Sequence, residues 1–433
     1  MPKMRQSINI GLMGLGVVGG GVAKALIEKA EVLAGQVGCP LTIRKILVSH
    51  PAKRRSIQVE PDLLTTDAGD ILADPEVDIV VEVMGGERPA LDYIREALIS
   101  AKHVVTANKE VMAKHGPELQ ALAQEHRVDL RYEASVGGGI PLIAPFQHDL
   151  SANRISAIYA IINGTTNYIL SRMAAEGLDF SLILKEAQEL GYAEADPAND
   201  VEGVDAAYKL AILASLAFHT KVGPEDVYRE GITRLAGRDF RYAKELGFAI
   251  KLLAIAKESD DEIEVRVHPT FVPEDFILAK VDGVFNAVQV EGDLVGKLLF
   301  HGEGAGARPT TSAVVADLIE LAHNINSGVG TRAKPRFEPS KTIRPMSEIR
   351  TRYYLRMSVA DRPGVLAQIS KTLGDNLISI SSVIQKGTDE RAQTAEMVIM
   401  THPAQEQAMQ RALREMEGLA VVQEISNFVR VEA

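Results

Sequence analysis

The sequence predicts an α/β protein of three domains, and three stretches of the chain carry this prediction. From Ser7 to about Tyr132, short β-rich runs alternate with helical patterns, which is typical of a parallel sheet with crossover helices. Residues 135–301 mix long helical patterns with longer β-like runs and indicate an α+β domain. From Tyr353 onward the order is strand, helix, strand, strand, helix, strand, which indicates a small α/β sandwich.

The composition is that of a globular protein: of 433 residues, 46% are hydrophobic and 24% are charged. The net charge of -11 argues against nucleic acid and anionic membranes as partners, because both attract basic surfaces. No apolar run approaches the roughly 18 residues of a membrane span. The glycine-rich N-terminus is a poor secretory signal. A single cysteine, Cys39, fits a reducing compartment, so we expect a cytoplasmic protein.

The first domain is expected at residues 1–134. Its strands are predicted at INIGLMG, LTIRKILV, VDIVVEVMG, HVVTANK and VDLRYEA, with helices between them. The first strand runs into GLGVVG and a helix, the G-x-G-x-x-G pattern of a Rossmann-type dinucleotide-binding domain, although a purely structural glycine turn is the alternative. The helix N-terminus would present free N–H groups to a pyrophosphate. The predicted phosphate-binding residues are Gly14, Leu15, Gly16, Val17, Val18 and Gly19.

The end of the second strand bears on the choice between NAD and NADP. An NAD-binding domain usually offers an acid there to the ribose hydroxyl, but this chain reads SHPAKRR, with no acid before Glu60. Lys53, Arg54 and Arg55 are placed to meet a 2′-phosphate, which favours NADP over NAD by a small margin. A solvated basic turn is the alternative.

Two further strands end in polar residues, where ligands of open parallel sheets collect. Glu82 ends one strand, and the other continues through Thr106 and Asn108 to Lys109. These positions are candidate cofactor contacts. By spacing alone, an exposed cation explains Lys109 better than a functional lysine.

The second domain is expected at residues 135–305. Helices are predicted around residues 182–190, 204–218 and 243–255, and strands at RISAIYAII, IEVRVHPTFV and VFNAVQVEG. The domain opens on YEASVGGGIPLI, whose three consecutive glycines can aim carbonyl oxygens at a hard cation near Glu133 or serve as a hinge. HGEGAGARPT is a second glycine-rich turn. The helix after it, over residues 306–330, is expected to return to the first domain, although the turn can also cradle a ligand.

One lysine stands in a predicted helix that is otherwise apolar. Between Ala206 and Phe218 the only formal charge is Lys209, and five carboxylates precede it. Asp205 lies four residues earlier, so both side chains project from one helical face. Desolvation moves the pKa of a lysine toward the working range, where the side chain can serve as an acid/base group. A structural i,i+4 salt bridge is the alternative, but nothing else on this helix needs water.

Residues 331–350 contain three prolines and a dense cluster of cations without apolar periodicity, so a linker is expected there. Residues 351–433 are expected to form a ferredoxin-like third domain. Its first strand turns into a helix at ADRPGVL, where Asp361 is predicted as the helix N-cap and Pro363 in the first turn. The free N–H groups of that turn can receive a carboxylate.

Taken together, these stretches resemble homoserine dehydrogenase in its three-domain form with a C-terminal ACT domain. The matching motifs follow the family order over nearly the whole chain: GLGVVG, TANK, EASVGGGIP, NGTTNYIL, GYAEADPANDVEGVDAAYKL, GEGAGARPT and DRPGVLAQI. The stretch from GYAEADP to Lys209 is the specific part, because unrelated dehydrogenases share the dinucleotide turn. The resemblance implies NAD(P)-dependent interconversion of L-homoserine and L-aspartate 4-semialdehyde, in the biosynthesis of threonine, methionine and isoleucine.

The resemblance also implies roles for single residues. Lys209 would be the acid/base residue and Asp205 would orient it, while Glu194 would bind the amino acid substrate and Asp200 would line the site. Lys109 would lie beside the nicotinamide and the substrate. Further cofactor contacts are implied at Thr106, Gly191 and Gly306. The implied ligands of a monovalent cation, expected to be Na⁺, are Glu133 and the carbonyls of Val136, Gly138 and Ile140.

One departure from the family concerns the cofactor. Many relatives carry an arginine where this chain has Ser49, which leaves the preference for NADP open.

The match to ACT domains implies an amino acid effector, L-threonine, bound between the ACT domains of a homodimer or homotetramer. The implied effector residues are Asp361, Pro363, Gly364, Val365, Leu366 and Asn376. An ACT domain that only oligomerises is one alternative. For the whole chain, the alternatives are another ACT-tailed dinucleotide dehydrogenase and a catalytically silent metabolite sensor. The intact Asp205–Lys209 pair argues against the sensor.

Overall fold

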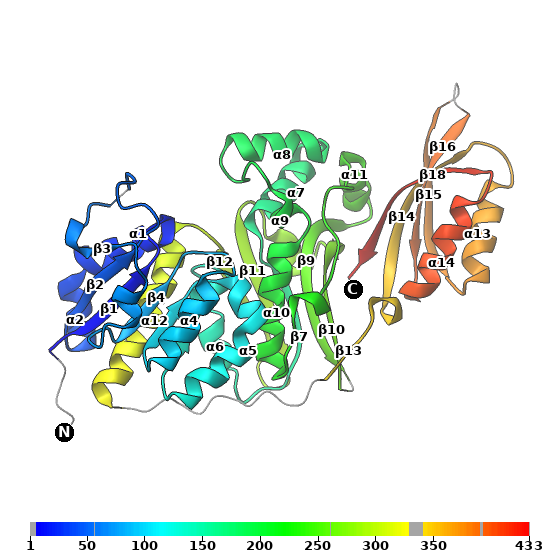
Figure 1. Cartoon of the computed structure of the whole chain (residues 1–433). Helices are drawn as coiled ribbons and strands as arrows, with labels where there is room; N and C mark the ends of the chain where they lie inside the picture. Colours follow the sequence, from blue (N-terminus) through cyan, green and yellow to red (C-terminus); the bar gives the residue numbers. More distant parts are fainter. Residues whose placement is uncertain (1–5, 56, 260, 329–340, 390–392, 433) are drawn as a thin grey trace. The chain divides into compact units, whose positions relative to one another are not determined.

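The computed structural model describes residues 6–55, 57–259, 261–328, 341–389 and 393–432 (Figure 1). The chain divides into two compact units. The first contains Met1–Ile155, Tyr208–Glu225 and Glu291–Ser340, and the second contains Ser156–Ala207, Asp226–Val290 and Lys341–Ala433. The first ten residues of the predicted linker 331–350 lie outside the described residues. Its last ten contain the short strand β13 (Thr342–Ile343), which pairs with β10.

The first unit contains a parallel sheet of six strands in the order β3-β2-β1-β4-β5-β6. This order reverses at β1, as in the doubly wound folds that bind dinucleotides. The predicted parallel sheet is confirmed, with β3 as a short addition. The strands are β1 (Ile8–Met13), β2 (Leu41–Leu47), β3 (Leu64–Thr65), β4 (Ile79–Glu82), β5 (His103–Thr106) and β6 (Leu130–Arg131).

The helix after the second glycine-rich turn, α12 (Ala307–Ser327), packs on the first helix of the chain, α1 (Val17–Glu28). A Cβ atom on Gly21 would lie 2.2 Å from Thr311 Oγ1, so a glycine is needed where the two helices meet. Leu318 and Leu321 of α12 share one apolar core with β1. The other helices of this unit are α2 (Ala30–Val37), α3 (Gly69–Leu72), α4 (Ala90–Ile99), α5 (Lys109–Glu125) and α6 (Ile143–Gln147).

The second unit is built on a mixed sheet that includes the strand order β11-β7-β9-β10-β18-β14-β16-β15. Its first four strands belong to the predicted α+β domain: β7 (Ile155–Ile161), β9 (Phe248–Ser259), β10 (Glu262–Pro273) and β11 (Phe285–Gly292). The helices that accompany them are α7 (Gly164–Glu176), α8 (Phe180–Glu189), α9 (Ala198–Val201) and α11 (Gly237–Glu245). Helix α10 (Val204–Phe218) begins in this unit and continues into the first.

The helix predicted around residues 243–255 is wrong. Helix α11 ends at Glu245, and the next residues form β9, which pairs with β10 along its whole length. The middle of β9 is buried without alternation, so the strand packs on both faces. A strand buried on both faces reads as a continuous apolar run, and such a run cannot be told from a buried helix by periodicity.

The last four strands form a ferredoxin-like domain in the order β18-β14-β16-β15, which confirms the predicted arrangement. Its elements are β14 (Arg350–Ala360), α13 (Val365–Asp375), β15 (Ile380–Asp389), β16 (Thr394–Thr401), α14 (Glu406–Glu417) and β18 (Val422–Val431). The C-terminal strand β18 also pairs with β10, so the two domains share one sheet. The predicted capping is wrong: the N-cap of α13 is Gly364, in a left-handed conformation, and both Asp361 and Pro363 precede the helix.

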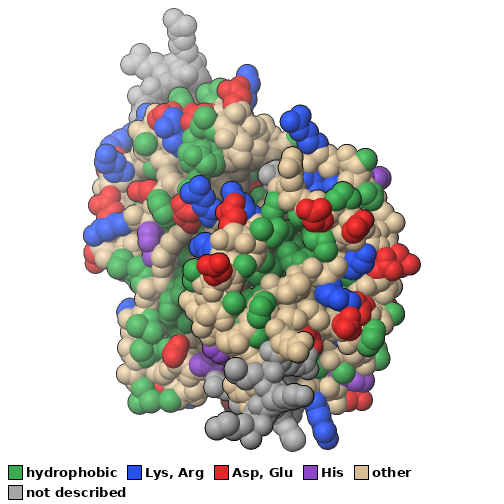
Figure 2. Space-filling model, turned by 90° about the vertical axis from the view of Figure 1, so that its left-hand side faces the viewer, with side chains coloured by type: hydrophobic (Ala, Val, Ile, Leu, Met, Phe, Trp, Pro, Cys, Tyr) green, Lys and Arg blue, Asp and Glu red, His purple; other side chains and the backbone are tan. Residues whose placement is uncertain are grey.

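Acidic and basic side chains are interspersed on the face of the protein drawn in Figure 2, and exposed hydrophobic side chains lie between them. A surface of mixed sign gives little long-range attraction for a polyanion. Within the described residues, the helices are all too short or too polar to cross a lipid bilayer.

Candidate active site

The glycine turn between β1 and α1 is shaped by close backbone contacts. Gly14 has a φ of +103°, and a Cβ atom there would lie 2.9 Å from the carbonyl oxygen of Val83. A Cβ atom on Gly19 would lie 2.0 Å from the carbonyl oxygen of Gly14. Gly16 is the N-cap of α1 and offers no side-chain cap, so the first N–H groups of the helix are available to a ligand.

This turn opens into a cavity of about 750 Å³ in the first unit. The cavity is lined by Gly14 to Val17, and Lys53 and Arg54 also line it, so the predicted phosphate turn and the predicted cations meet in one place. Arg55 holds the basic turn, because its guanidinium donates to the carbonyls of three residues between His50 and Lys53. Gly85 also lines the cavity, and the lining residues that were not predicted as contacts include Ser49, Met84 and Tyr93.

Two of the predicted strand-end residues bind each other. Thr106 donates its hydroxyl to Glu82 at 2.6 Å, and both side chains are fully buried. Burial raises the pKa of Glu82, while the hydrogen bonds from Thr106 and from the Met84 N–H act in the opposite direction. The Thr106 hydroxyl therefore braces two neighbouring strand ends. Lys109 is the first residue of α5, directly after its N-cap Asn108.

The two predicted glycine-rich turns pack against each other within the first unit. A Cβ atom on Gly138 would lie 2.6 Å from the backbone of Gly304, and one on Gly139 would lie 2.7 Å from Pro309. Gly306 is the N-cap of α12 and has a φ of +114°. A backbone contact this close explains why neither turn carries side chains at these positions.

The carboxylate of Glu133 caps the short helix α6. It accepts backbone N–H groups from Leu142, Ile143 and Ala144 at 2.6, 2.8 and 2.7 Å. Both oxygens of the carboxylate are therefore occupied by the start of the helix. The group of Glu133 that can bind an ion is its main-chain carbonyl. The carbonyls of Val136, Gly138 and Ile140 accept no backbone N–H within the described part of the chain. Such a set of carbonyl oxygens fits a hard monovalent cation.

Asp317 on α12 supports the same turn and was not predicted from the sequence. Its carboxylate accepts the backbone N–H of Glu133 at 2.9 Å. Burial raises the pKa of Asp317 to about 8. The sequence contained one indication of this role: Asp317 lies on the apolar side of the predicted helix, where an acid needs a partner.

The acidic loop before α10 is held by one asparagine in the second unit. The side-chain amide of Asn163 donates to Asp200 at 2.7 Å and to Asp205 at 2.9 Å. Its side-chain oxygen accepts the N–H of Thr166 and caps α7. Asn163 thus brings together two residues that were predicted for the substrate site. It lies in the NGTTNYIL motif, and an asparagine just before a helix could have been predicted as an N-cap from the sequence.

Glu194 lies in the loop between α8 and α9 and is exposed. Gln188 donates to the carbonyl oxygens of Glu194 and Ala195, at 3.1 and 3.3 Å, and Thr165 donates to the carbonyl of Tyr192. The backbone of this loop is held while the carboxylate stays accessible. Gly191 opens the loop with a φ of +77°.

Both charged residues of α10 are buried. Asp205 is 3% exposed and Lys209 is 8% exposed, and they stand one turn apart on the same helix. Lysine is almost never buried to this degree without a partner. The burial weakens the alternative of an ordinary surface salt bridge.

In the third domain the predicted effector residues differ in their exposure to solvent. Asp361, Pro363, Gly364 and Leu366 are exposed, whereas Val365 and Asn376 are buried. The Asn376 amide donates to Thr372 and Glu415, so its side chain joins α13 to α14.

Three family descriptions match this chain in succession. The homoserine dehydrogenase NAD-binding domain matches residues 14–133, homoserine dehydrogenase matches residues 141–319, and the ACT domain matches residues 353–420.

Known homoserine dehydrogenases are similar over the full length. The enzyme of Neisseria gonorrhoeae is 43% identical over 98% of this chain and 99% of its own. The crystal structure of a homoserine dehydrogenase from Thiobacillus denitrificans has a TM-score of 0.91 at 42% identity and covers 100% of this chain and 99% of its own. A hyperthermophilic archaeal homoserine dehydrogenase in complex with NADPH has a TM-score of 0.62 at 26% identity, over 73% of this chain and 97% of its own.

The glycine turn at a doubly wound sheet, the buried Asp205 and Lys209, and the matched domains along the chain agree with one another. The chain belongs to the homoserine dehydrogenase family of NAD(P)-dependent oxidoreductases and carries its ACT domain.

Proposed function

We propose that the chain interconverts L-homoserine and L-aspartate 4-semialdehyde with Lys209 as the acid/base residue, in the biosynthesis of threonine, methionine and isoleucine. The observation that carries this assignment is the burial of Lys209 and Asp205 on one helix, with Asp205 fixed by Asn163. A bound nicotinamide would supply the hydride acceptor or donor at the carbinol carbon. Lys209 takes the hydroxyl proton during oxidation and returns it to the oxygen during reduction. Asp205 keeps the lysine side chain oriented, and Lys109 contributes a second cation beside the reacting groups.

Recognition of the amino acid is assigned to Glu194, with Asp200 lining the site. The Glu194 carboxylate is exposed on a loop whose backbone is held by Gln188, which suits capture of a substrate ammonium. We expect Glu194→Gln to raise the KM for homoserine by about tenfold or more, because one charge-assisted hydrogen bond is lost. The KM for the cofactor should not change. Steady-state kinetics check this, with Glu189→Gln on the neighbouring helix as control, and an unchanged KM for homoserine would remove Glu194 from the substrate site.

NADP is the proposed cofactor, with NAD as the alternative. Lys53 and Arg54 line the cavity at the glycine turn, and the archaeal relative was solved with NADPH. We expect the double variant Lys53→Ala/Arg54→Ala to raise the KM for NADP by roughly tenfold or more and to leave the KM for NAD unchanged, because only NADP carries the 2′-phosphate. Lys24→Ala, an exposed lysine on α1, is the control. A parallel loss for both cofactors would contradict a 2′-phosphate contact.

A monovalent cation, proposed as Na⁺, would be held by the carbonyls of Glu133, Val136, Gly138 and Ile140. Its role would be to stiffen the turn that packs on Gly304 and Pro309. The single cysteine is buried and fits a reducing compartment, which supports a place in the cytoplasm.

Regulation is proposed to act through the ACT domain, with L-threonine as the effector and a homodimer or homotetramer as the assembly. The exposed turn at Asp361 to Gly364 supports an effector site there. Millimolar threonine should lower the activity of the wild-type enzyme, and Asp361→Ala should weaken that inhibition. A wild-type enzyme that neither binds threonine nor is inhibited by it would leave the ACT domain with a structural role.

A further inference from the structure

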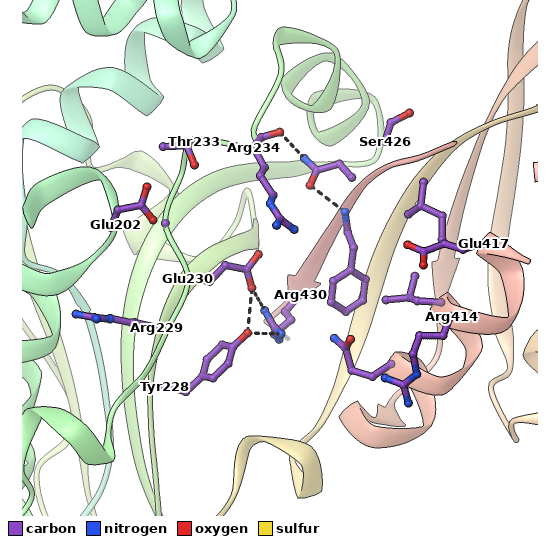
Figure 3. A pocket seen from close by; sticks show the side chains of 16 residues that line it. Glu202, Tyr228, Arg229, Glu230, Thr233, Arg234, Arg414, Glu417, Ser426 and Arg430 are labelled. Carbon is purple, nitrogen blue, oxygen red and sulfur yellow. Dashed lines mark hydrogen bonds and ion pairs between the residues drawn. The ribbon is translucent and has the colours of Figure 1, made fainter. Parts of the chain in front are cut away.

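A cleft of about 930 Å³ lies within the second unit, and its lining residues do not include the exposed turn at Asp361 to Gly364 (Figure 3). One wall is the segment 228–234, which contains the short strand β8 (Tyr228–Arg229). The other wall is formed by α14 and β18 of the ACT domain. The cleft is thus built from catalytic and regulatory parts of the same chain.

Charged groups of both signs line this cleft without a partner in the described residues. The guanidinium of Arg234 points into the middle of the cleft, and among the described residues only the main-chain carbonyl of Arg234 takes part in a hydrogen bond. Within the described part of the chain, no hydrogen bond or ion pair engages the side chains of Arg414, Glu202 or Glu417. Glu202 follows α9 and lies beside the segment 228–234, while Arg414 and Glu417 stand on α14. These two cations and two carboxylates, together with Arg229, therefore line one cavity without a side-chain partner among the described residues.

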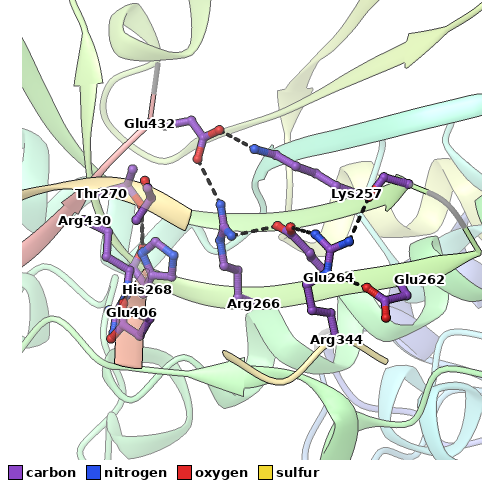
Figure 4. Close-up of polar contacts among 12 residues, drawn as sticks. Lys257, Glu262, Glu264, Arg266, His268, Thr270, Arg344, Glu406, Arg430 and Glu432 are labelled. Carbon is purple, nitrogen blue, oxygen red and sulfur yellow. Dashed lines mark hydrogen bonds and ion pairs between the residues drawn. The ribbon is translucent and has the colours of Figure 1, made fainter. Parts of the chain in front are cut away.

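The back of the cleft is fixed by a buried arginine. Arg430 of β18 is 2% exposed, and its guanidinium binds Glu230 at 2.7 Å, Glu406 at 2.6 Å and the Tyr228 hydroxyl at 3.2 Å. Just after β18, Glu432 joins Lys257 of β9 to Arg266 of β10 (Figure 4). Buried ion pairs of this kind hold a single geometry, so they fix the back of the cleft at Tyr228 and Glu230.

The segment 228–234 is in direct backbone contact with the loop at residues 200–203, which carries Asp200 of the proposed substrate site. Ile232 donates its N–H to the carbonyl of Val201 at 2.9 Å, and a Cβ atom on Gly231 would lie 2.5 Å from the same oxygen. Val201 follows Asp200, whose carboxylate shares Asn163 with Asp205. A displacement of residues 231–234 therefore cannot leave the loop at residues 200–203 in place, because the backbones are already in contact.

We propose that this cleft binds a small zwitterion of the α-amino acid class and that its occupancy shifts the loop carrying Asp200. Arg234 receives the carboxylate, since a guanidinium fork matches a carboxylate in a bidentate pair. Glu202 or Glu417 receives the ammonium. This site is separate from the turn at Asp361. The effect of a bound amino acid on homoserine binding rests on the proposed function. The binding of the amino acid in the cleft does not.

Calorimetric titration of the full-length protein tests the proposal. The probes are glycine, L-threonine, L-methionine and L-lysine, with acetate, malonate and methylammonium as ligands of one sign. We expect at least one amino acid to bind, with affinity at least tenfold weaker in Arg234→Ala and in Arg414→Ala. Arg241→Ala, an exposed arginine of α11 outside the cleft, and Asp361→Ala should keep the affinity. The bound amino acid should also change the KM for homoserine in the wild type.

Three outcomes would overturn the proposal. The first is the absence of binding by every amino acid probe. The second is binding that survives Arg234→Ala and Arg414→Ala but disappears in Asp361→Ala, which would assign the ligand to the turn alone. The third is binding of acetate or malonate as tight as that of the amino acids, which would make the cleft an anion site. Calorimetry measures binding without turnover, so these outcomes can be distinguished even if the protein proves not to be a homoserine dehydrogenase.

Discussion

Replacing Lys209 with alanine should lower kcat by about 10²–10⁴-fold, the range of a lost acid/base residue. Lys209 is buried on α10 one turn after Asp205, and between Ala206 and Phe218 it is the only charged residue. Without it, Asp205 remains as the one charged group on this part of the helix. The KM for the cofactor should change little, because the glycine turn and the basic turn lie on other elements.

Stopped-flow and steady-state assays of the variant measure this loss, and circular dichroism and cofactor titration show whether the fold and cofactor site persist. Lys209→Met keeps the buried aliphatic stem and should lose as much activity as Lys209→Ala. Lys221→Ala, an exposed lysine just after the same helix, should behave like the wild type. A kcat close to the wild-type value in both Lys209 variants would remove the residue from proton transfer.

Replacing Asp239 with alanine should destabilise the fold by about 3–5 kcal/mol, the usual cost of breaking a buried ion pair by removing one partner. Asp239 is fully buried near the start of α11. Its carboxylate accepts from the Tyr354 hydroxyl at 3.0 Å, from Arg356 Nε at 2.7 Å and from the Asn427 amide at 2.7 Å. All three donors belong to the ACT domain. Desolvation lowers the pKa of Arg356, but Asp239 reverses this and holds the pKa above its usual range.

Thermal and denaturant unfolding of Asp239→Ala measure the expected loss. Arg238→Ala is the matched control, because its side chain is 62% exposed and its ion pair with Glu396 lies at the surface. That variant should lose no more than about 1 kcal/mol. Limited proteolysis of Asp239→Ala should also release the ACT domain sooner. Equal unfolding midpoints for the two variants would show that Asp239 does not anchor the ACT domain.

Most of the fold follows from local sequence patterns. The alternation of strands and helices, the G-x-G-x-x-G turn and the final βαββαβ order each depend on neighbouring residues, and the structure contains all three. The main error, at Phe248 to Ser259, arose because β9 is buried on both faces and loses the alternation that marks a strand. Capping at Gly364 was missed because a left-handed glycine and an acidic N-cap are both acceptable starts for a helix.

The parts of the site that were missed depend on contacts between distant residues. Asn163 meets Asp205 across 42 residues, and Asp239 meets Arg356 across 117. The Glu133 carboxylate caps α6 through backbone N–H groups at Leu142, Ile143 and Ala144, a contact that no local pattern indicated. In each case the residue type was informative, but its partner became known only from the tertiary arrangement.

The most direct measurement is the initial rate of cofactor reduction when the purified protein is given L-homoserine with NADP⁺ or with NAD⁺. We expect homoserine-dependent reduction with at least one cofactor, faster with NADP⁺ at equal concentration. Little or no reduction is expected with 4-hydroxybutanoate, which lacks the ammonium assigned to Glu194. The absence of homoserine-dependent reduction with both cofactors would contradict the assignment of the reaction to this chain.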